Sequence, residues 1–328
     1  MQEITYHLRT FFRVCLFVLL PILPLQETYA QPHMGDVQIS ATAEELALVE
    51  LIQFKLEAIR IHVGKPVNEV PDFVIKGATQ REVFYQAVNL YQKTDRLAQE
   101  IARDTLPLEL DKLSQERSAA DITKILKTAL GRVGRVLERL GIQSPPNAFV
   151  TNLSADITDS DLYVAILKTN QQINQLLEYK FSPSEVYQQV TTALHITLVL
   201  YERFPEVRRI LDEPEFIPGK APSDVFQLLL DCYAVVRDMA MLSGVEVLEI
   251  VSVSKKEFYI PSEVYDVATL LVSELNYIYD SIPGLSEPEK SYFPGRKYPS
   301  DVYQRASHLQ QTLSRLHDLI KANPDWRH

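Results

Sequence analysis

Hydrophobic residues recur along most of this chain with the spacing of one face of an α-helix, in stretches of about twenty residues separated by proline-bearing connectors. A five-residue phrase, Pro-Ser-acid-Val-aromatic, opens four of these stretches, each copy 38 or 39 residues after the one before. The copies are Pro183–Tyr187, Pro222–Phe226, Pro261–Tyr265 and Pro299–Tyr303. Proline is tolerated in the first turn of a helix, and an acid there faces the positive end of the helix dipole. The phrase therefore predicts the first turn of a repeated helix.

Three earlier stretches begin with weaker copies of the phrase. The acid of each copy falls at Glu82, Asp121, Asp161, Glu185, Asp224, Glu263 and Asp301. The intervals between these acids are 39, 40, 24, 39, 39 and 38 residues, so one interval breaks the period. The next residue is aliphatic in every copy: Val83, Ile122, Leu162, Val186, Val225, Val264 and Val302. An apolar residue follows four positions later each time, which predicts one buried stripe on each helix.

Capping signals place the other helix boundaries. Thr42 and Glu45 fit a capping box at the start of a helix that Gly64 stops. Further helices are predicted over residues 79–103, 119–140 and 159–179. The sequence thus predicts an all-α protein, a helical repeat or bundle of about seven to eight helices with long Pro-containing connectors and a 38–40 residue period.

The connector lengths carry information about helix direction. A connector of about 17 residues can reach about 55 Å, whereas a helix of about 20 residues is only about 30 Å long. Helices 39 residues apart can therefore point the same way. Only Lys180–Pro183 joins the helices that contain Asp161 and Glu185, which predicts a tight antiparallel hairpin. In the competing interpretation each connector hides a short helix, with Glu206–Leu211 the best candidate.

Two connector segments have an apolar character of their own. Residues 65–78 contain a short extended apolar piece, and residues 245–254 fit either a strand or a helix.

The N-terminus has the pattern of a secretory signal peptide. Arg9 and Arg13 precede an apolar run, Val14–Leu25, and a small residue, Ala30, marks a cleavage site. This run of about 12 residues is shorter than the roughly 20 that a membrane-spanning helix needs. Cleavage after Ala30 is predicted, and an uncleaved anchor is the alternative.

The chain divides into three regions on this basis. They are a signal peptide over 1–30, an N-terminal helical region over 31–157 and a C-terminal helical repeat region over 158–328, with a Pro-bearing linker from Ser144 before the second boundary. No membrane span is predicted in the mature chain. The mature chain keeps the net charge of −10, which argues against a nucleic-acid partner. Its one cysteine, Cys232, lies in an apolar helical run and is predicted to be buried and inert.

Recognisable catalytic motifs are missing from the sequence. It has no Gly-rich phosphate loop, no His-Glu-x-x-His, no Cys pair and no Gly-x-Ser-x-Gly. His308 and His317 are too far apart on one helix to hold a metal alone, and His195 is interpreted as a core-edge residue with a satisfied ring nitrogen. The sequence therefore predicts no enzyme, and no catalytic, cofactor-binding or metal-binding residue.

Aromatic residues follow the aliphatic position in six of the seven copies, and four of them are tyrosines. A tyrosine can line a ligand groove with its ring packed and its hydroxyl wet. Phenylalanine stands in two copies, which favours packing between repeats instead. Trp326 either staples the C-terminal segment onto the last helix or presents an anchor to a partner. The candidate ligand or partner contacts are Tyr163, Tyr187, Tyr265, Tyr303 and Trp326.

A polar cluster falls in the helix over 79–103. Its members are Asn89, Tyr91, Lys93, Asp95 and Arg96. Positions 89, 93 and 96 share one helix face and positions 91 and 95 another, so the cluster is interpreted as two solvated faces with local ion pairs.

Two functions remain. The first is an exported, non-catalytic interaction or scaffold module of the cell envelope, periplasmic or secreted, with another envelope protein as its partner; a bacterial periplasm fits best. The alternative is an extracytoplasmic small-ligand sensor or binding protein that uses the aromatic helix starts. Neither function requires a cofactor, and the sequence does not set the oligomeric state.

Overall fold

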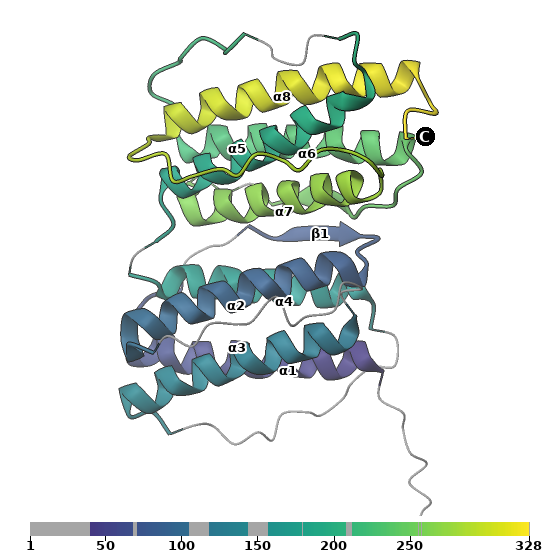
Figure 1. The fold of residues 1–328 in the computed structure, drawn as a ribbon. Helices are drawn as coiled ribbons and strands as arrows, with labels where there is room; N and C mark the ends of the chain where they lie inside the picture. The colour runs from purple at the N-terminus through teal and green to yellow at the C-terminus, as the bar shows by residue number, and fades with distance from the viewer. Residues whose placement is uncertain are drawn as a thin grey trace, which may run out of the picture. The chain divides into compact units, whose positions relative to one another are not determined.

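A computed structural model describes residues 40–67, 71–104, 118–143, 157–178, 180–207, 212–254, 256 and 258–327. The predicted signal peptide, its cleavage site and most of the linker from Ser144 lie outside these residues. The described residues contain eight α-helices and one two-stranded sheet, which confirms the predicted all-α class (Figure 1). None of these helices combines the length and hydropathy that a membrane-spanning segment needs.

The repeat phrase does open helices where the sequence predicted it. The helices are α1 (Ala41–His62), α2 (Gln80–Ala102), α3 (Ala119–Leu140), α4 (Asp159–Leu176), α5 (Pro183–Leu200), α6 (Pro222–Leu242), α7 (Pro261–Asp280) and α8 (Pro299–Ala322). The strands are β1 (Phe73–Lys76) and β2 (Glu249–Val253), and a 3₁₀ turn, η2, covers Tyr201–Arg203. One cap differs from the prediction. Ser40, rather than Thr42, caps α1 by accepting a hydrogen bond from the Ala43 amide.

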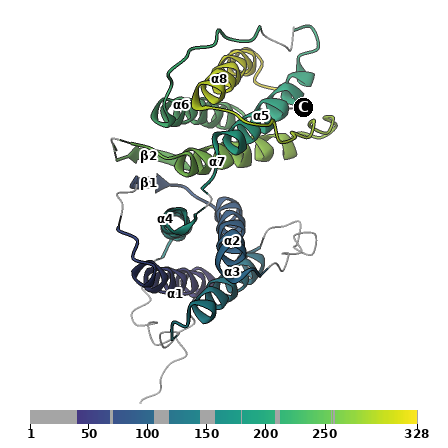
Figure 2. The same cartoon turned by 90° about the vertical axis from the view of Figure 1, so that its left-hand side faces the viewer.

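Each helix packs on two others in a pattern that occurs twice. Helices α1 and α2 each contact α3 and α4, and helices α5 and α6 each contact α7 and α8. We call α1–α4 the first bundle and α5–α8 the second bundle; Figure 2 shows both nearly end-on. The second bundle repeats the first helix by helix, and the 24-residue interval between the acids is the junction between them.

Helix α4 belongs with the helices before it. Its main contacts are with α1 and α2, although the sequence placed a region boundary between residues 157 and 158. That boundary stays a prediction, because the linker before it lies outside the described residues. In packing terms, the second bundle begins at the α4–α5 connector.

The helices within each bundle point the same way. In the second bundle, first-turn residues from all four helices line one small pocket. In the first bundle, the Ser160 hydroxyl at the start of α4 accepts a hydrogen bond from the Ala78 amide just before α2. Within a bundle, each helix therefore ends at the opposite end from the start of the next helix, as the connector lengths predicted. Most of Glu206–Leu211, the best candidate for a hidden connector helix, lies outside the described residues, so the choice between the two interpretations stays a prediction.

The two bundles run antiparallel to each other. Arg81 at the start of α2 pairs with Glu274 late in α7, and Arg96 late in α2 pairs with Glu185 in the first turn of α5. Direction thus reverses between α4 and α5, as predicted, but the predicted hairpin is wrong because these two helices do not pack together. A short connector only requires that the end of α4 and the start of α5 lie close together. It does not require the two helices to pack side by side, and α5 packs on α7 and α8 instead.

A small sheet also joins the bundles. Strand β1 from the α1–α2 connector pairs antiparallel with β2 from the α6–α7 connector, with Phe73 opposite Val253 and Lys76 opposite Glu249. The extended piece predicted within 65–78 is β1, and the segment 245–254, which fitted a strand or a helix, contains a strand.

Candidate functional site

The acid of the repeat phrase caps its own helix. In all seven copies its carboxylate accepts a hydrogen bond from the backbone N–H of the residue before the helix, at N–O distances of 2.7 to 3.0 Å. This satisfies a free first-turn amide and places negative charge at the positive end of each helix. Such charge is needed here, because four parallel helices bring four positive ends together.

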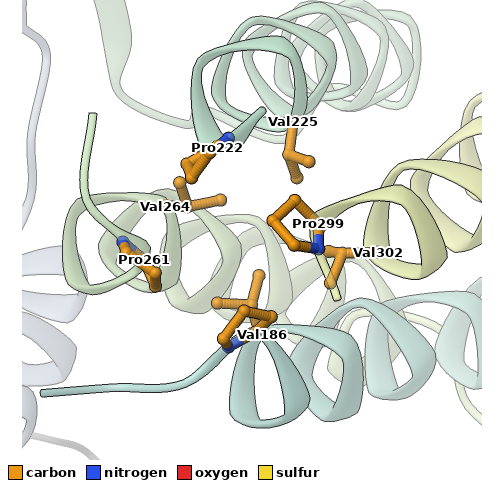
Figure 3. Close-up of a pocket in the computed structure, with 8 residues that line it drawn as sticks. Val186, Pro222, Val225, Pro261, Val264, Pro299 and Val302 are labelled. Atoms are coloured by element: carbon orange, nitrogen blue, oxygen red, sulfur yellow. The ribbon is translucent and has the colours of Figure 1, made fainter. Parts of the chain in front are cut away.

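The proline and valine of the phrase meet on the axis of the second bundle. Figure 3 shows Val186, Val225, Val264 and Val302 turned toward a common centre, with the prolines around them. These four valines are at most 2 % exposed, which confirms the predicted buried stripe. The cavity they leave is about 10 Å³, at the lower limit for one water molecule. This centre is packing and holds no ligand-sized site.

Two serines of the phrase bind the connectors of neighbouring helices. Ser184 in α5 accepts a hydrogen bond of 2.9 Å from the Lys297 amide, just before α8. Ser300 in α8 accepts one of 3.1 Å from the Lys220 amide, just before α6. Ser184 and Ser300 therefore each fasten their helix to the connector that enters a neighbouring helix.

The aromatic residues of the repeat phrase also contact the connectors that enter neighbouring helices. Phe181, two positions before α5, stacks on Tyr265 of α7 with ring centroids 4.2 Å apart. Tyr259, two positions before α7, stacks on Phe226 of α6 at 4.1 Å. Such stacked pairs stabilise a fold by about 0.5–1.5 kcal/mol beyond the area they bury.

Cations take the place of the aromatic rings at the other two helix starts. The Lys220 ammonium, two positions before α6, lies 4.1 Å from the ring centroid of Tyr303 in α8. The Lys297 ammonium, two positions before α8, lies 4.8 Å from that of Tyr187 in α5. The four contacts run from α5 to α7, α7 to α6, α6 to α8 and α8 back to α5. We call this closed set the N-terminal ring.

The hydroxyls of three of the candidate tyrosines accept hydrogen bonds from protein donors. Tyr163 is buried and accepts a hydrogen bond of 2.9 Å from Gln86. Tyr187 accepts one of 2.9 Å from Arg305 Nε, and Tyr265 a longer one from Gln189. No described groove gathers the repeat hydroxyls, so the arrangement favours packing between helices.

Trp326, the fifth candidate, is 5 % exposed. It stacks on Phe204 with ring centroids 6.0 Å apart, and its Nε1 donates to Ser243 Oγ at 3.1 Å. It therefore staples the C-terminal segment, but to the ends of η2 and α6 rather than to α8.

Exposed aromatic side chains are concentrated on the connectors that enter the helices of the second bundle. Of the six large aromatic side chains that the described residues expose, Phe54 lies elsewhere and the others lie on the connectors that enter α6, α7 and α8. We call these five residues the aromatic rim: Phe216, Phe258, Tyr292, Phe293 and Tyr298. Tyr292 is 80 % exposed and Phe258 73 % exposed.

The sequence contained a signal for this rim that its analysis missed. Phe216–Lys220 and Tyr292–Arg296 both read aromatic, apolar, Pro, Gly, basic. Gly219 and Gly295 have φ values of 80° and 75°, so each motif turns its connector toward the next helix. This second repeated phrase is the part of the repeat that faces solvent.

The rim also carries positive charge. Lys220, Arg296 and Lys297 lie against aromatic rings, and none of them forms an ion pair with the residues described. A surface of exposed aromatic rings with unpaired cations is typical of the centre of a protein interface.

A buried polar layer lies between the two bundles. Lys93 of α2 is fully buried and binds Asp266 of α7. Asp266 also accepts hydrogen bonds from Asn89 of α2 and Asn174 of α4. The interpretation of Asn89 and Lys93 as part of a solvated face is wrong, because both side chains are buried and bind Asp266 of α7.

The other face predicted on this helix is also packed. Asp95 pairs with Arg132 of α3 at 3.0 Å, and Tyr91 is 5 % exposed. Local sequence spacing could not reveal partners that lie on other helices.

A second ion pair in the layer contains an acid whose pKa is raised. Glu274 is fully buried and pairs with Arg81, which also binds Glu82. Burial raises the pKa of Glu274 to about 8, although the Arg81 guanidinium opposes the rise. Burial also lowers the pKa of Lys93, against the attraction of Asp266. These groups hold the bundles together.

The other chemically reactive residues have structural surroundings. His195 Nδ1 lies 2.8 Å from the Glu289 carbonyl oxygen, which fits the predicted core-edge role. Cys232 is buried, and burial raises its thiol pKa. Within the ranges that the structure describes, no three His, Cys, Asp or Glu side chains are grouped to hold a metal ion.

Comparison of the chain with protein-family models, with curated protein sequences and with solved structures found no match. The functional argument therefore rests on the geometry of the site alone.

Proposed function

We propose that the chain is an exported, non-catalytic interaction module of the cell envelope, and that the aromatic rim is its contact surface for another envelope protein. The observation that carries this proposal is that five of the six large aromatic side chains exposed among the described residues lie on the connectors that enter α6, α7 and α8. Exposure of apolar side chains to water is unfavourable in free energy, and their burial against a partner surface removes this cost.

The chemistry of the rim indicates its partner. Lys220, Arg296 and Lys297 add positive charge around the rings. The partner surface is therefore apolar at its centre and acidic at its edge. The contacts of the N-terminal ring hold the four helix starts together. The connectors that carry the rim therefore lead into a well-packed end of the bundle.

The small-ligand alternative receives less support from the contacts. Each repeat aromatic of the second bundle already contacts the residue two positions before a neighbouring helix. The cavity at the helix starts has a volume of only about 10 Å³. Ligand pockets of ordinary size have volumes of about 300–1,000 Å³.

Site-specific photo-crosslinking in the native cells tests the proposal. A benzoylphenylalanine residue replaces Tyr292 in one strain and the exposed Met241, at the opposite end of α6, in a control strain. We expect a discrete adduct with an envelope protein from position 292 and none from position 241. Equal adducts at both positions, or none at position 292, would contradict the assignment of the rim as the contact surface.

A further inference from the structure

A groove separate from the aromatic rim runs between α6 and β2. It follows one face of α6 from Phe226 to Asp238, and residues of β2 form its other side. Its volume is about 360 Å³, within the range of binding pockets. Ala234, on its floor, is exposed to solvent.

Among the described residues, no strand pairs with one edge of β2. Strand β2 pairs with β1 on its other side, and Figure 2 shows β2 between β1 and α6. Alternate backbone groups of an antiparallel strand point to opposite edges, so half of those in β2 point away from β1. Helix α6 cannot form backbone hydrogen bonds with these groups, because its own backbone groups are bonded within the helix. The contacts between α6 and this segment are made by side chains, Tyr233 to the Leu248 carbonyl and Arg237 to Glu249.

The length of the groove suits an extended chain. From Phe226 to Asp238, α6 rises about 18 Å, since each helical residue adds about 1.5 Å. A β-strand adds about 3.3 Å per residue, so about five extended residues span the same distance.

The two ends of the groove differ in chemistry. At one end, the stacked rings of Phe226 and Tyr259 form an apolar wall, and Leu230 continues it. At the other end, Arg237 is paired with Glu249, while Asp238 is exposed and forms no ion pair with any residue that the structure describes. The charge left over at this end is therefore negative.

We propose that this groove binds an extended segment of a partner protein, which adds a third strand to the β1–β2 sheet. Its backbone pairs with the free edge of β2, and its alternate side chains are apolar where they meet Phe226 and Tyr259. A lysine or arginine of the segment lies beside Asp238. The segment thus continues the sheet that already joins the two bundles. This site is independent of the proposed contact at the aromatic rim.

Selection of peptides on the full chain provides the test. A phage library of random heptapeptides is panned against the folded wild-type protein, and enriched peptides are synthesised and their binding measured by fluorescence anisotropy. We expect enriched peptides to share alternating apolar residues with one basic residue near an end. We also expect bound peptide to slow hydrogen exchange at the amides of Glu249–Val253.

Two variant pairs locate the binding. Ala234→Trp fills the groove, and Ala322→Trp places the same side chain at an exposed position on α8. Asp238→Lys reverses the charge at the groove, and Asp318→Lys makes the same change on α8. We expect each groove variant to weaken peptide binding about tenfold or more, and each α8 variant to leave it unchanged.

A melting curve of each groove variant and of its α8 control shows whether the variant is folded. Loss of binding with an unchanged melting curve is then a loss of the site and not of the fold. Enriched peptides that bind all four variants equally would overturn the proposal. So would the absence of any enriched peptide, or protection from exchange at sites other than β2.

Discussion

Phe181 lies stacked on Tyr265, with ring centroids 4.2 Å apart and ring planes at 21°, although the two residues precede and open different helices. Tyr265 is the aromatic of one repeat phrase, and Phe181 is the residue two positions before another. The same pair of positions is occupied by Tyr259 on Phe226, again as stacked rings. The repeat therefore encodes a contact between successive helix starts, which explains why an aromatic residue is needed and why Phe and Tyr both serve.

Position 297 should accept an aromatic residue, because Phe181 fills the equivalent place at the start of α5. We expect Lys297→Phe to keep the free energy of unfolding within about 1 kcal/mol of the wild type, since a stacked ring replaces the cation on Tyr187. Lys297→Ala, which removes the ammonium from the Tyr187 ring, should cost about 1 kcal/mol. Urea unfolding of the three proteins makes the comparison; a larger loss in the Phe variant than in the Ala variant would be the wrong order.

The serines of the phrase should differ in their contribution. Ser300→Ala removes the acceptor of the Lys220 amide, and we expect a loss of about 1 kcal/mol. Ser262 is buried, and its hydroxyl has no hydrogen-bond partner among the described residues. Ser262→Ala should therefore change stability by less than about 0.5 kcal/mol or raise it. Thermal melts of the two alanine variants decide the matter, and equal losses would remove the distinction between the two serines.

Asp266 is expected to be the most sensitive residue of the polar layer. Asp266→Ala leaves Lys93 charged, buried and unpaired, which typically costs about 3–5 kcal/mol. Replacing both partners, as Lys93→Met with Asp266→Ala, removes the unpaired charge and should recover a large part of that loss. Chemical denaturation of both single variants and the double variant measures the coupling. A double variant less stable than Asp266→Ala would speak against the ion pair.

Glu274 should make stability depend on pH. Its folded pKa, about 8, is raised above the ordinary value of 4.5, so the folded protein binds its proton more tightly than the unfolded chain. The resulting stabilisation is complete below about pH 4.5 and is lost as the pH rises through about 8. Glu274→Gln mimics the protonated form and should lose less stability than the wild type between about pH 5 and pH 8. Urea midpoints at both pH values provide the measurement, and parallel losses in the two proteins would assign the dependence to other groups.

The sequence predicted the features that its own period encodes. Val264 and its equivalents recur after each acid, so their burial followed from spacing alone, and Pro261 marked the first residue of α7. The direction of the helices followed from connector length. These are local or periodic properties, which one chain displays without knowledge of its contacts.

The remaining features depend on partners far along the chain. Lys93 and Asp266 are 173 residues apart, and nothing in the pattern around Lys93 distinguishes a solvated face from one covered by another bundle. The bond between Ser184 and the Lys297 amide joins residues 113 positions apart, so it could be found only once the arrangement of the helices was known. The 24-residue interval was visible, but it indicated a hairpin rather than the junction of two bundles.

A double-mutant cycle at Phe181 and Tyr265 tests the closed N-terminal ring most directly. Both residues are changed to alanine singly and together, and the free energy of unfolding is measured for each protein in urea. A second cycle combines Phe181→Ala with Tyr303→Ala, which belongs to the ring but does not contact Phe181. We predict a coupling of about 1 kcal/mol in the first cycle and additive effects in the second. Additive effects in the first cycle would contradict the claim that the repeat encodes a stabilising contact between the starts of neighbouring helices.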